Sequence, residues 1–193
     1  MKKVMFVLML SVLSVVLRAQ VTVGLKAGAN ITNFSGGDFD EVKKKAIVGF
    51  HGGGYLNFSL GAISLQPELL FSTQGARIDS VSGSYDWKVN YLTLPVMFKY
   101  RSAGGFYLEA GPQFGFKLSE DVKDQTIDGF AKDLDLSAGI GLGFHTPGGF
   151  GIGARYLAGL SKVGDFDPSE VGGVDPDFKN SVLQLGIFFK ISK

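Results

Sequence analysis

The chain has 193 residues, of which 19 are basic and 18 acidic, and it contains 28 glycines, 17 phenylalanines and no cysteine. The nearly balanced charge argues against nucleic acid as a partner, because nucleic acid requires a concentrated basic face. Without cysteine there is no disulfide framework, no thiolate metal site and no lipid-bearing cysteine, and the length suits a single domain.

Residues 1–19 have the pattern of a secretory signal peptide. Two lysines precede an apolar run over residues 4–17, and Ala19 is a small residue suited to cleavage. Because the run is shorter than the roughly 20 residues of a transmembrane helix, we expect cleavage after Ala19 rather than a retained anchor helix. The mature chain, residues 20–193, then has 16 basic and 18 acidic residues and a net charge of −2.

In the rest of the chain, apolar and polar residues alternate along eight segments. In residues 106–118 one parity carries Phe, Leu, Ala and Pro, and the other carries Gly, Gln, Tyr and isolated charges, the period-two pattern of a β-strand with two unlike faces. Each segment is long enough to cross a bilayer, which takes about 9 to 11 tilted residues. The expected strands are 21–33, 47–58, 63–77, 87–100, 106–118, 133–145, 150–162 and 181–191.

The connections between these segments alternate between long and short. The short ones contain the Gly and Pro that tight turns require, and the alternation is typical of an up-and-down outer-membrane barrel with periplasmic turns and longer outer loops. An even number of strands then leaves both termini periplasmic. The short connections are 59–62, 101–105 and 146–149, and the long ones are 34–46, 78–86, 119–132 and 163–180.

Volume indicates which face points inward. An eight-stranded barrel has an interior that ordinary side chains already fill, so the large apolar side chains of eight strands would not fit inside it. The sequence therefore predicts an all-β fold, an eight-stranded antiparallel up-and-down transmembrane β-barrel of OmpA and OmpX size. Its apolar face contacts lipid, and Gly, Ser, Gln and a few charges line the lumen.

Two further patterns accompany the strands. Aromatic residues beside the short turns share the lipid-facing parity, which favours an interfacial girdle on the periplasmic side over ordinary strand-end aromatics. Three prolines inside the segments, Pro67, Pro95 and Pro112, predict local breaks in strand pairing. The girdle residues are Phe58, Tyr100, Phe106, Phe144 and Phe150.

The last segment has the order polar-x-Gly-x-x-aromatic-x-apolar, in Gln184, Gly186, Phe189 and Ile191. This order resembles the C-terminal signal by which bacterial outer-membrane barrels are recognised for insertion. The wider pattern resembles the small outer-membrane β-barrel proteins of Bacteroidota, called porin-family or PorT-like, and this resemblance implies fold and location but no single activity. Its segments are GFHGGGYLNFSL (49–60), ISLQPELLFSTQGAR (63–77), VNYLTLPVMFKY (89–100) and FYLEAGPQFGFKL (106–118).

Charged residues also occur on the lumen parity. Four of them, Lys26, Glu68, Glu109 and Arg155, lie several residues from either strand end and should meet near mid-depth, where charges must pair. We expect Arg155 to bridge Glu68 or Glu109, as part of a polar plug in preference to a gate or proton path. The full set is Lys26, Glu68, Lys99, Glu109, Lys117, Asp135, Arg155 and Lys190.

No catalytic, metal or cofactor site is predicted. His51 and His145 lie near opposite ends of the barrel, and although Ser72 could approach His51, no acid is placed to orient the histidine. The glycines of 139–143 are not followed by the helix that a dinucleotide site needs. The acidic residues of 165–177 fit a solvated loop better than a calcium site, and lysines 43–45 fit solvation better than lipopolysaccharide binding.

The sequence thus predicts a monomeric barrel with a structural or interaction role through the loops at 34–46, 119–132 and 163–180. Its expected partners are outer-membrane lipid and lipopolysaccharide, the barrel insertion machinery, and secretion or cell-surface proteins. Three alternatives stay open: a narrow diffusion channel, a PorT-like accessory of a protein secretion system, and a soluble lipocalin-like binder.

Overall fold

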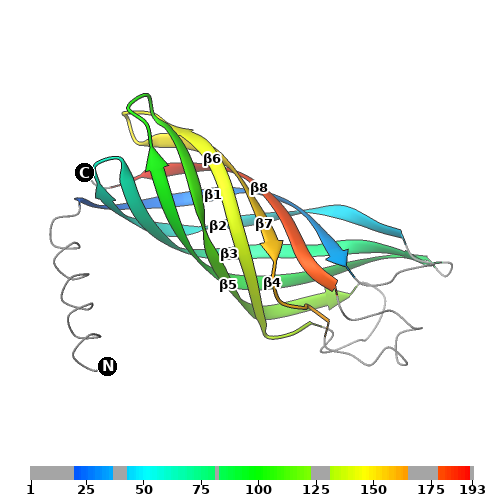
Figure 1. Ribbon diagram of the computed structural model, residues 1–193. Helices are drawn as coiled ribbons and strands as arrows, with labels where there is room; N and C mark the ends of the chain where they lie inside the picture. The colour runs from blue at the N-terminus through cyan, green and yellow to red at the C-terminus, as the bar shows by residue number, and fades with distance from the viewer. Residues whose placement is uncertain (1–19, 37–42, 81–82, 123–130, 165–177, 192–193) are drawn as a thin grey trace, which may run out of the picture.

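The computed structural model describes residues 20–36, 43–80, 83–122, 131–164 and 178–191, and the predicted signal peptide therefore lies outside the described residues. The described residues form a closed barrel in which consecutive strands pair antiparallel and the last strand pairs with the first (Figure 1). No helix in these ranges is long and apolar enough to cross a membrane. The predicted fold is confirmed, with strands β1 (Gln20–Gly36), β2 (Lys43–Leu60), β3 (Ile63–Ser80), β4 (Gly83–Arg101), β5 (Phe106–Val122), β6 (Leu134–His145), β7 (Phe150–Gly159) and β8 (Phe178–Lys190).

The two ends of the barrel differ. The short turns at 61–62, 102–105 and 146–149 lie at one end, which we call the turn end, together with the start of β1 and the last residues of β8. We call the opposite end the loop end. An even number of strands places both ends of the barrel chain on the same side.

One side of the barrel extends farther at the loop end than the sequence predicted (Figure 1). β2 to β5 have 17 to 19 residues, although about 9 to 11 suffice to cross a bilayer. Pairing continues there through polar residues that do not keep the apolar alternation, such as Asp79 with Ser84. β7, in contrast, ends at Gly159, three residues before its predicted end.

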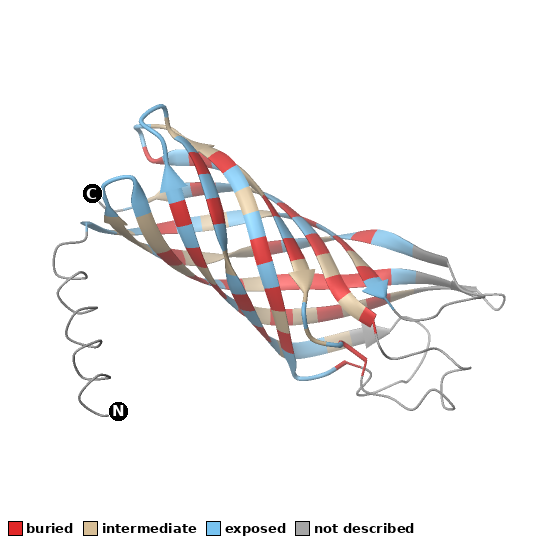
Figure 2. Cartoon of the chain, in the orientation of Figure 1, coloured by how far each residue is buried: buried red, intermediate tan, exposed pale blue. Residues whose placement is uncertain are grey.

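The outer wall of the barrel is apolar. Ile140, Phe98 and Leu108 are 65%, 61% and 61% exposed, and buried and exposed residues alternate along the strands (Figure 2). Water-soluble monomers rarely expose a contiguous apolar surface of this extent. The apolar parity therefore faces outward, as the volume of the interior requires.

The lumen is less polar than the sequence analysis expected. Buried amides such as Gln113 and Gln184 do line it, but the rings of Tyr55, Tyr107 and Phe188 pack edge to face inside its turn end. The predicted lining of Gly, Ser, Gln and a few charges is therefore present, but it did not anticipate these aromatic rings. These aromatic residues lie on the lumen parity, so counting residues along each strand could have found them.

A second group of large apolar side chains fills the lumen farther toward the loop end. Phe178 packs against Phe34 and Trp87, with ring centroids 4.5 and 6.4 Å apart. Between the two aromatic groups, Leu70 and Met97 are fully buried. The interior is thus closely packed along much of its length.

Glycines on the lumen parity make room for the aromatic rings. A Cβ atom added at Gly24 would meet the ring of Tyr55, and one added at Gly151 would meet the ring of Phe188. Where one strand has a glycine, a large side chain of another strand can occupy the free space, and the narrow interior is filled without overlap. This explains why glycine is so common on one face of the strands.

Gly153 gives a test of this packing. The hydroxyl of Tyr107 is the first atom that a Cβ there would meet, and the next are the Leu142 carbonyl oxygen at 3.4 Å and Tyr107 Cζ at 3.5 Å. We expect Gly153→Ala to lower the free energy of unfolding by about 1 to 3 kcal/mol, and to cost much less in a Tyr107→Phe background, which lacks the obstructing oxygen. Urea unfolding in detergent micelles measures both, and equal costs in the two backgrounds would contradict the packing.

The three strand prolines interrupt the pairing of neighbouring strands but do not shift its register. The pairing of β2 with β3 skips residues beside Pro67, that of β3 with β4 skips residues at Pro95, and that of β4 with β5 skips residues at Pro112. Proline has no N–H to donate to a neighbouring strand. The register shifts lie elsewhere, after Ala46 and after Asn90.

Candidate functional site

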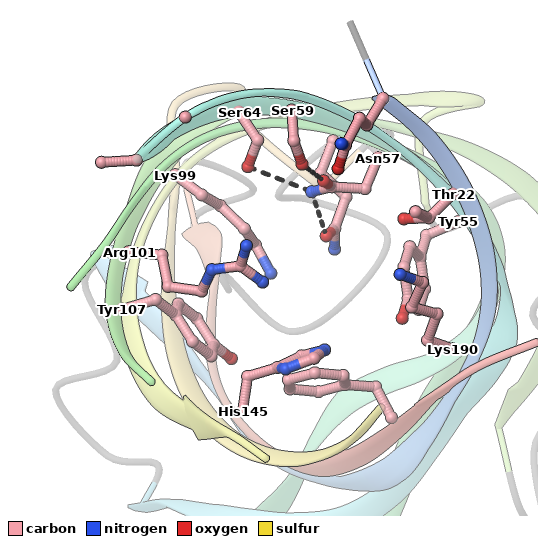
Figure 3. A pocket seen from close by; sticks show the side chains of 15 residues that line it. Thr22, Tyr55, Asn57, Ser59, Ser64, Lys99, Arg101, Tyr107, His145 and Lys190 are labelled. Carbon is pink, nitrogen blue, oxygen red and sulfur yellow. Dashed lines mark hydrogen bonds between the residues drawn. The ribbon is translucent and has the colours of Figure 1, made fainter. Parts of the chain in front are cut away.

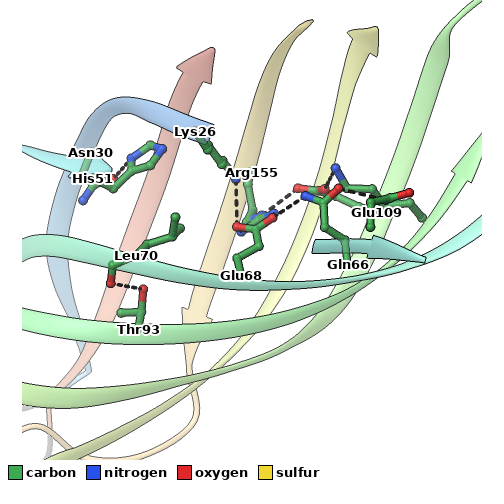
Figure 4. Close-up of polar contacts among 11 residues, drawn as sticks. Lys26, Asn30, His51, Gln66, Glu68, Leu70, Thr93, Glu109 and Arg155 are labelled. Carbon is green, nitrogen blue, oxygen red and sulfur yellow. Dashed lines mark hydrogen bonds and ion pairs between the residues drawn. The ribbon is translucent and has the colours of Figure 1, made fainter. Parts of the chain in front are cut away.

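Arg155 on β7 lies at the centre of an ion-pair cluster inside the barrel (Figure 4). Its Nη1 and Nη2 donate to Glu68 Oε2 and Oε1 on β3, at 2.9 and 2.7 Å, and its Nε donates to Glu109 Oε1 on β5 at 2.6 Å. Two parallel bonds to one carboxylate make this the strongest arrangement that an arginine can form with an acid. These are three of the four residues that the sequence predicted near mid-depth, and the fourth, Lys26, lies beside Glu68.

Two lysines and a glutamine extend the cluster. Lys26 Nζ on β1 lies 3.3 Å from Glu68 Oε2, and Lys99 Nζ on β4 lies 3.0 Å from Glu109 Oε2. Gln66 Nε2 donates to Glu68 Oε1 at 2.8 Å. Glu68 thereby accepts bonds from three side chains, of which sequence reasoning had missed Gln66.

The cluster is buried and carries an excess of positive charge. Arg155 and Glu68 are each 2% exposed, and Glu109 is 5% exposed. Three cations face two carboxylates within it. Because buried charge is costly unless it is paired and hydrogen-bonded, every carboxylate oxygen here is within ion-pair distance of a cation.

Lys99 links the cluster to the aromatic group at the turn end. Its ammonium nitrogen lies 4.3 Å from the centroid of the Tyr107 ring and 5.4 Å from that of Phe188. A cation over a ring face is attracted by the electrons of that face. The aromatic rings therefore offset part of the excess positive charge.

A second polar network surrounds Asn30 on β1. Its Oδ1 is 2.7 Å from His51 Nδ1, and its Nδ2 donates to Ser72 Oγ and to the Thr73 carbonyl, both at 3.0 Å. The asparagine lies between the histidine and the serine in this hydrogen-bond chain, so Ser72 and His51 do not form a nucleophile and base pair. The network links β1, β2 and β3 through buried side chains.

The other charged residues of the lumen parity lie apart from the Arg155 cluster. Asp135 accepts bonds from Ser137 Oγ at 2.8 Å and from Asn180 Nδ2 at 3.0 Å. Lys117 Nζ lies 3.5 Å from Glu120 and 3.4 Å from Asp133, and it donates to the Ala131 carbonyl. Lys190 lies at the turn end, where β8 finishes.

The predicted girdle residues lie beside the turns, and the predicted insertion signal lies at the end of the chain, on β8 and just after it. Phe106 packs against Phe144 at 5.0 Å between ring centroids, and Phe106, Tyr100 and Phe150 are exposed on the outer wall, while Phe58 and Phe144 are half-buried. Of the insertion signal, Phe189 and Ile191 also face outward. Gln184 is buried in the lumen and Gly186 is half-buried, against His51.

The described residues hold no group of three or more His, Asp or Glu side chains that could bind a metal ion. The acidic residues of 165–177 lie outside the described residues. The cluster inside the barrel is therefore a set of paired charges, in which both carboxylates are occupied by cations of the protein itself.

A closed antiparallel barrel with an apolar outer wall and ion pairs inside defines a transmembrane β-barrel protein. The chain belongs to the outer membrane protein beta-barrel domain family, whose model matches residues 17–165. This membership supports a location in the outer membrane. No curated protein sequence matches the chain.

Solved structures share this fold at low sequence identity. Neisserial surface protein A has a TM-score of 0.55 and 13% identity, with 89% of this chain and 99% of that chain covered. Ail of Yersinia pestis, solved with the heparin analogue sucrose octasulfate, has a TM-score of 0.50 and 16% identity, covering 89% and 99%. OprG from Pseudomonas aeruginosa has a TM-score of 0.50 and 15% identity, covering 91% and 98%.

Proposed function

We propose that this protein is an outer-membrane barrel with a lumen closed to solutes, which acts through the surface at its loop end. The ion-pair cluster supports this proposal most directly. Arg155, Glu68 and Glu109 come from strands on different sides of the barrel, meet across the lumen and are almost fully buried. Charges that lined an open aqueous channel would instead remain in contact with water.

Conductance in planar lipid bilayers tests the closed lumen. We expect no steady conductance above that of the bare bilayer for the wild-type protein. Arg155→Ala should produce measurable channel openings, because Arg155 is the largest fully buried side chain in the described part of the barrel and alanine cannot span to the two carboxylates. A heat-modifiable shift in gel mobility serves as the control that the variant is folded.

Each other result of this experiment has a definite meaning. Steady conductance of the wild-type protein would contradict the plug and favour the narrow diffusion channel. A folded Arg155→Ala variant that stays silent would show that the ion-pair cluster is not what closes the lumen.

The long strands of the loop end support an interaction role. β2 to β5 exceed the length that a bilayer requires, so this wall would stand clear of the membrane and carry the loops with it. Exposed charges occur there, such as Arg77, which pairs with Asp86. Ail is named as an attachment invasion locus protein, so the fold can host a surface interaction, although the loops would decide the partner.

The topology supports an orientation with the turn end in the periplasm. In this orientation the aromatic residues beside the turns would lie at the inner interface, and lipopolysaccharide would surround the loop end. Cleavage of the signal peptide after Ala19 is part of the same proposal. The loops expected to act, 34–46, 119–132 and 163–180, lie partly outside the described residues. A monomer needs no further contact, because a closed barrel leaves no strand edge to pair.

A PorT-like accessory role in protein secretion is the second candidate, favoured by the sequence resemblance to the Bacteroidota barrels. It predicts a secretion defect in a deletion strain and co-purification with components of a translocon. The closed-lumen proposal predicts neither of these by itself.

A further inference from the structure

A basic vestibule lies at the turn end of the lumen (Figure 3). Its cavity volume is about 80 Å³, which suits a small ion or a short solute rather than a large ligand. Three cationic side chains, Lys99, Arg101 and Lys190, line it together with the imidazole of His145, and no acidic side chain among the described residues does so. The vestibule therefore concentrates positive charge at the mouth of a narrow opening.

The basic side chains of the vestibule lie at the turn-end termini of three strands. Lys99 and Arg101 lie two residues apart at the end of β4, His145 ends β6 and Lys190 ends β8, so all four face the same space. Figure 3 shows Lys99 and Arg101 on one wall and Lys190 on the opposite one. A ligand in the middle could contact both walls.

Two of these cations have no acidic partner within the described part of the chain. Lys99 is paired with Glu109 of the ion-pair cluster, whereas Arg101 and Lys190 form no ion pair with any described residue. A concave site with one sign of charge attracts ions of the opposite sign more strongly than a flat surface does. Arginine adds a fork of N–H donors that matches the geometry of carboxylate and phosphate oxygens.

Neutral side chains line the rest of the vestibule. Asn57 and Gln66 present amides, with Asn57 Nδ2 donating to Gln66 Oε1 at 3.0 Å and to Ser64 Oγ at 3.1 Å. The rings of Tyr107 and Phe188 also line it. Polar and aromatic side chains beside a few charged groups are typical of a site for a small organic ligand.

We propose that the vestibule is a binding site for small solutes that carry a carboxylate or phosphate group, approached from the turn end. Arg101 and Lys190 bind the anionic group, and the amide and ring side chains beside them contact the rest of the solute. The proposed anion contacts differ from the charges that close the lumen, because Arg101 and Lys190 are not members of the ion-pair cluster, although Lys99 belongs to both the cluster and the vestibule lining.

Nuclear magnetic resonance titration of the folded barrel tests the site. The protein is placed in micelles of an uncharged maltoside detergent, which provides no phosphate headgroup, and titrated with inorganic phosphate or with succinate. We expect saturable shifts of backbone amide signals at Ala62, Arg101 and His145. The double variant Arg101→Gln/Lys190→Gln should weaken the apparent affinity about tenfold or more.

The matched control removes two cations from the loop end, in the variant Arg77→Gln/Lys88→Gln, and should leave the affinity unchanged. Saturation by phosphate alone or by succinate alone would identify which anionic group the site accepts. Shifts that chloride reproduces at equal ionic strength, or that both double variants lose equally, would overturn the proposal. The single variants Arg101→Gln and Lys190→Gln provide the same test if the double variant fails to fold.

Discussion

Replacing Glu68 with glutamine is expected to lower the free energy of unfolding by about 3 to 5 kcal/mol, the usual cost of removing one partner of a buried ion pair. Glu68 accepts two bonds from Arg155 and one from Gln66, and it is ion-paired with Lys26. Glutamine has a single acceptor oxygen, and its amide group would direct N–H donors at other donors. The variant also leaves three cations facing Glu109 alone.

Removing the central cation should cost less than removing this acid. In Arg155→Met, Lys26 remains 3.3 Å from Glu68 and Lys99 remains 3.0 Å from Glu109, so each carboxylate keeps a cation. The variant loses three hydrogen bonds but also removes the excess positive charge. Arg155→Met should therefore unfold at a higher urea concentration than Glu68→Gln.

Urea unfolding in micelles measures both variants against Asp86→Asn as a control. Asp86 pairs with Arg77, whose side chain is 49% exposed, and exposed pairs contribute about 0 to 1 kcal/mol. If Arg155→Met proves more damaging than Glu68→Gln, the balance of charge does not govern the stability of the cluster.

Placing a charge on the middle of the outer wall is the second change with a large expected effect. Ile140 is 65% exposed, lies midway along β6, and pairs with Ala110 and Tyr156. In a bilayer its side chain would contact lipid at depth, where arginine costs about 2 to 4 kcal/mol. We therefore expect Ile140→Arg to reduce the folded fraction in lipid vesicles, measured by the heat-modifiable gel shift.

Leu60 provides the matched control for this test. It is 44% exposed at the last position of β2, beside a turn, where an arginine should cost only about 0 to 1 kcal/mol. Equal losses for Leu60→Arg and Ile140→Arg would mean that depth in the bilayer does not decide the cost. A water-soluble barrel, the alternative open at the start, would tolerate both changes.

Much of the ion-pair cluster could be predicted from the sequence. The parity of Glu68, Glu109 and Arg155 places them on the lumen face, and their distance from the strand ends places them at similar depth. Both properties are local to each strand. Gln66 lies two residues before Glu68 on the same face of β3, so parity could have shown it, and it was missed because only charged residues were considered.

The aromatic group inside the turn end shows a second limit. Tyr55, Tyr107 and Phe188 follow the lumen parity, yet large rings in a narrow barrel look implausible until the glycines opposite them are considered. Gly24 makes space for one ring and Gly151 for another. Such pairing between strands cannot be recovered from one strand at a time.

The sequence by itself determined the number and order of the strands, the face that each presents to lipid, and the end at which the turns lie. It could do so because alternation and turn residues are properties of neighbouring positions. Only the tertiary structure decided that Arg155 holds two carboxylates at once and that Arg101 and Lys190 share a vestibule. Closing the barrel sets the stagger between strands, and that stagger brings residues distant in the sequence to the same depth.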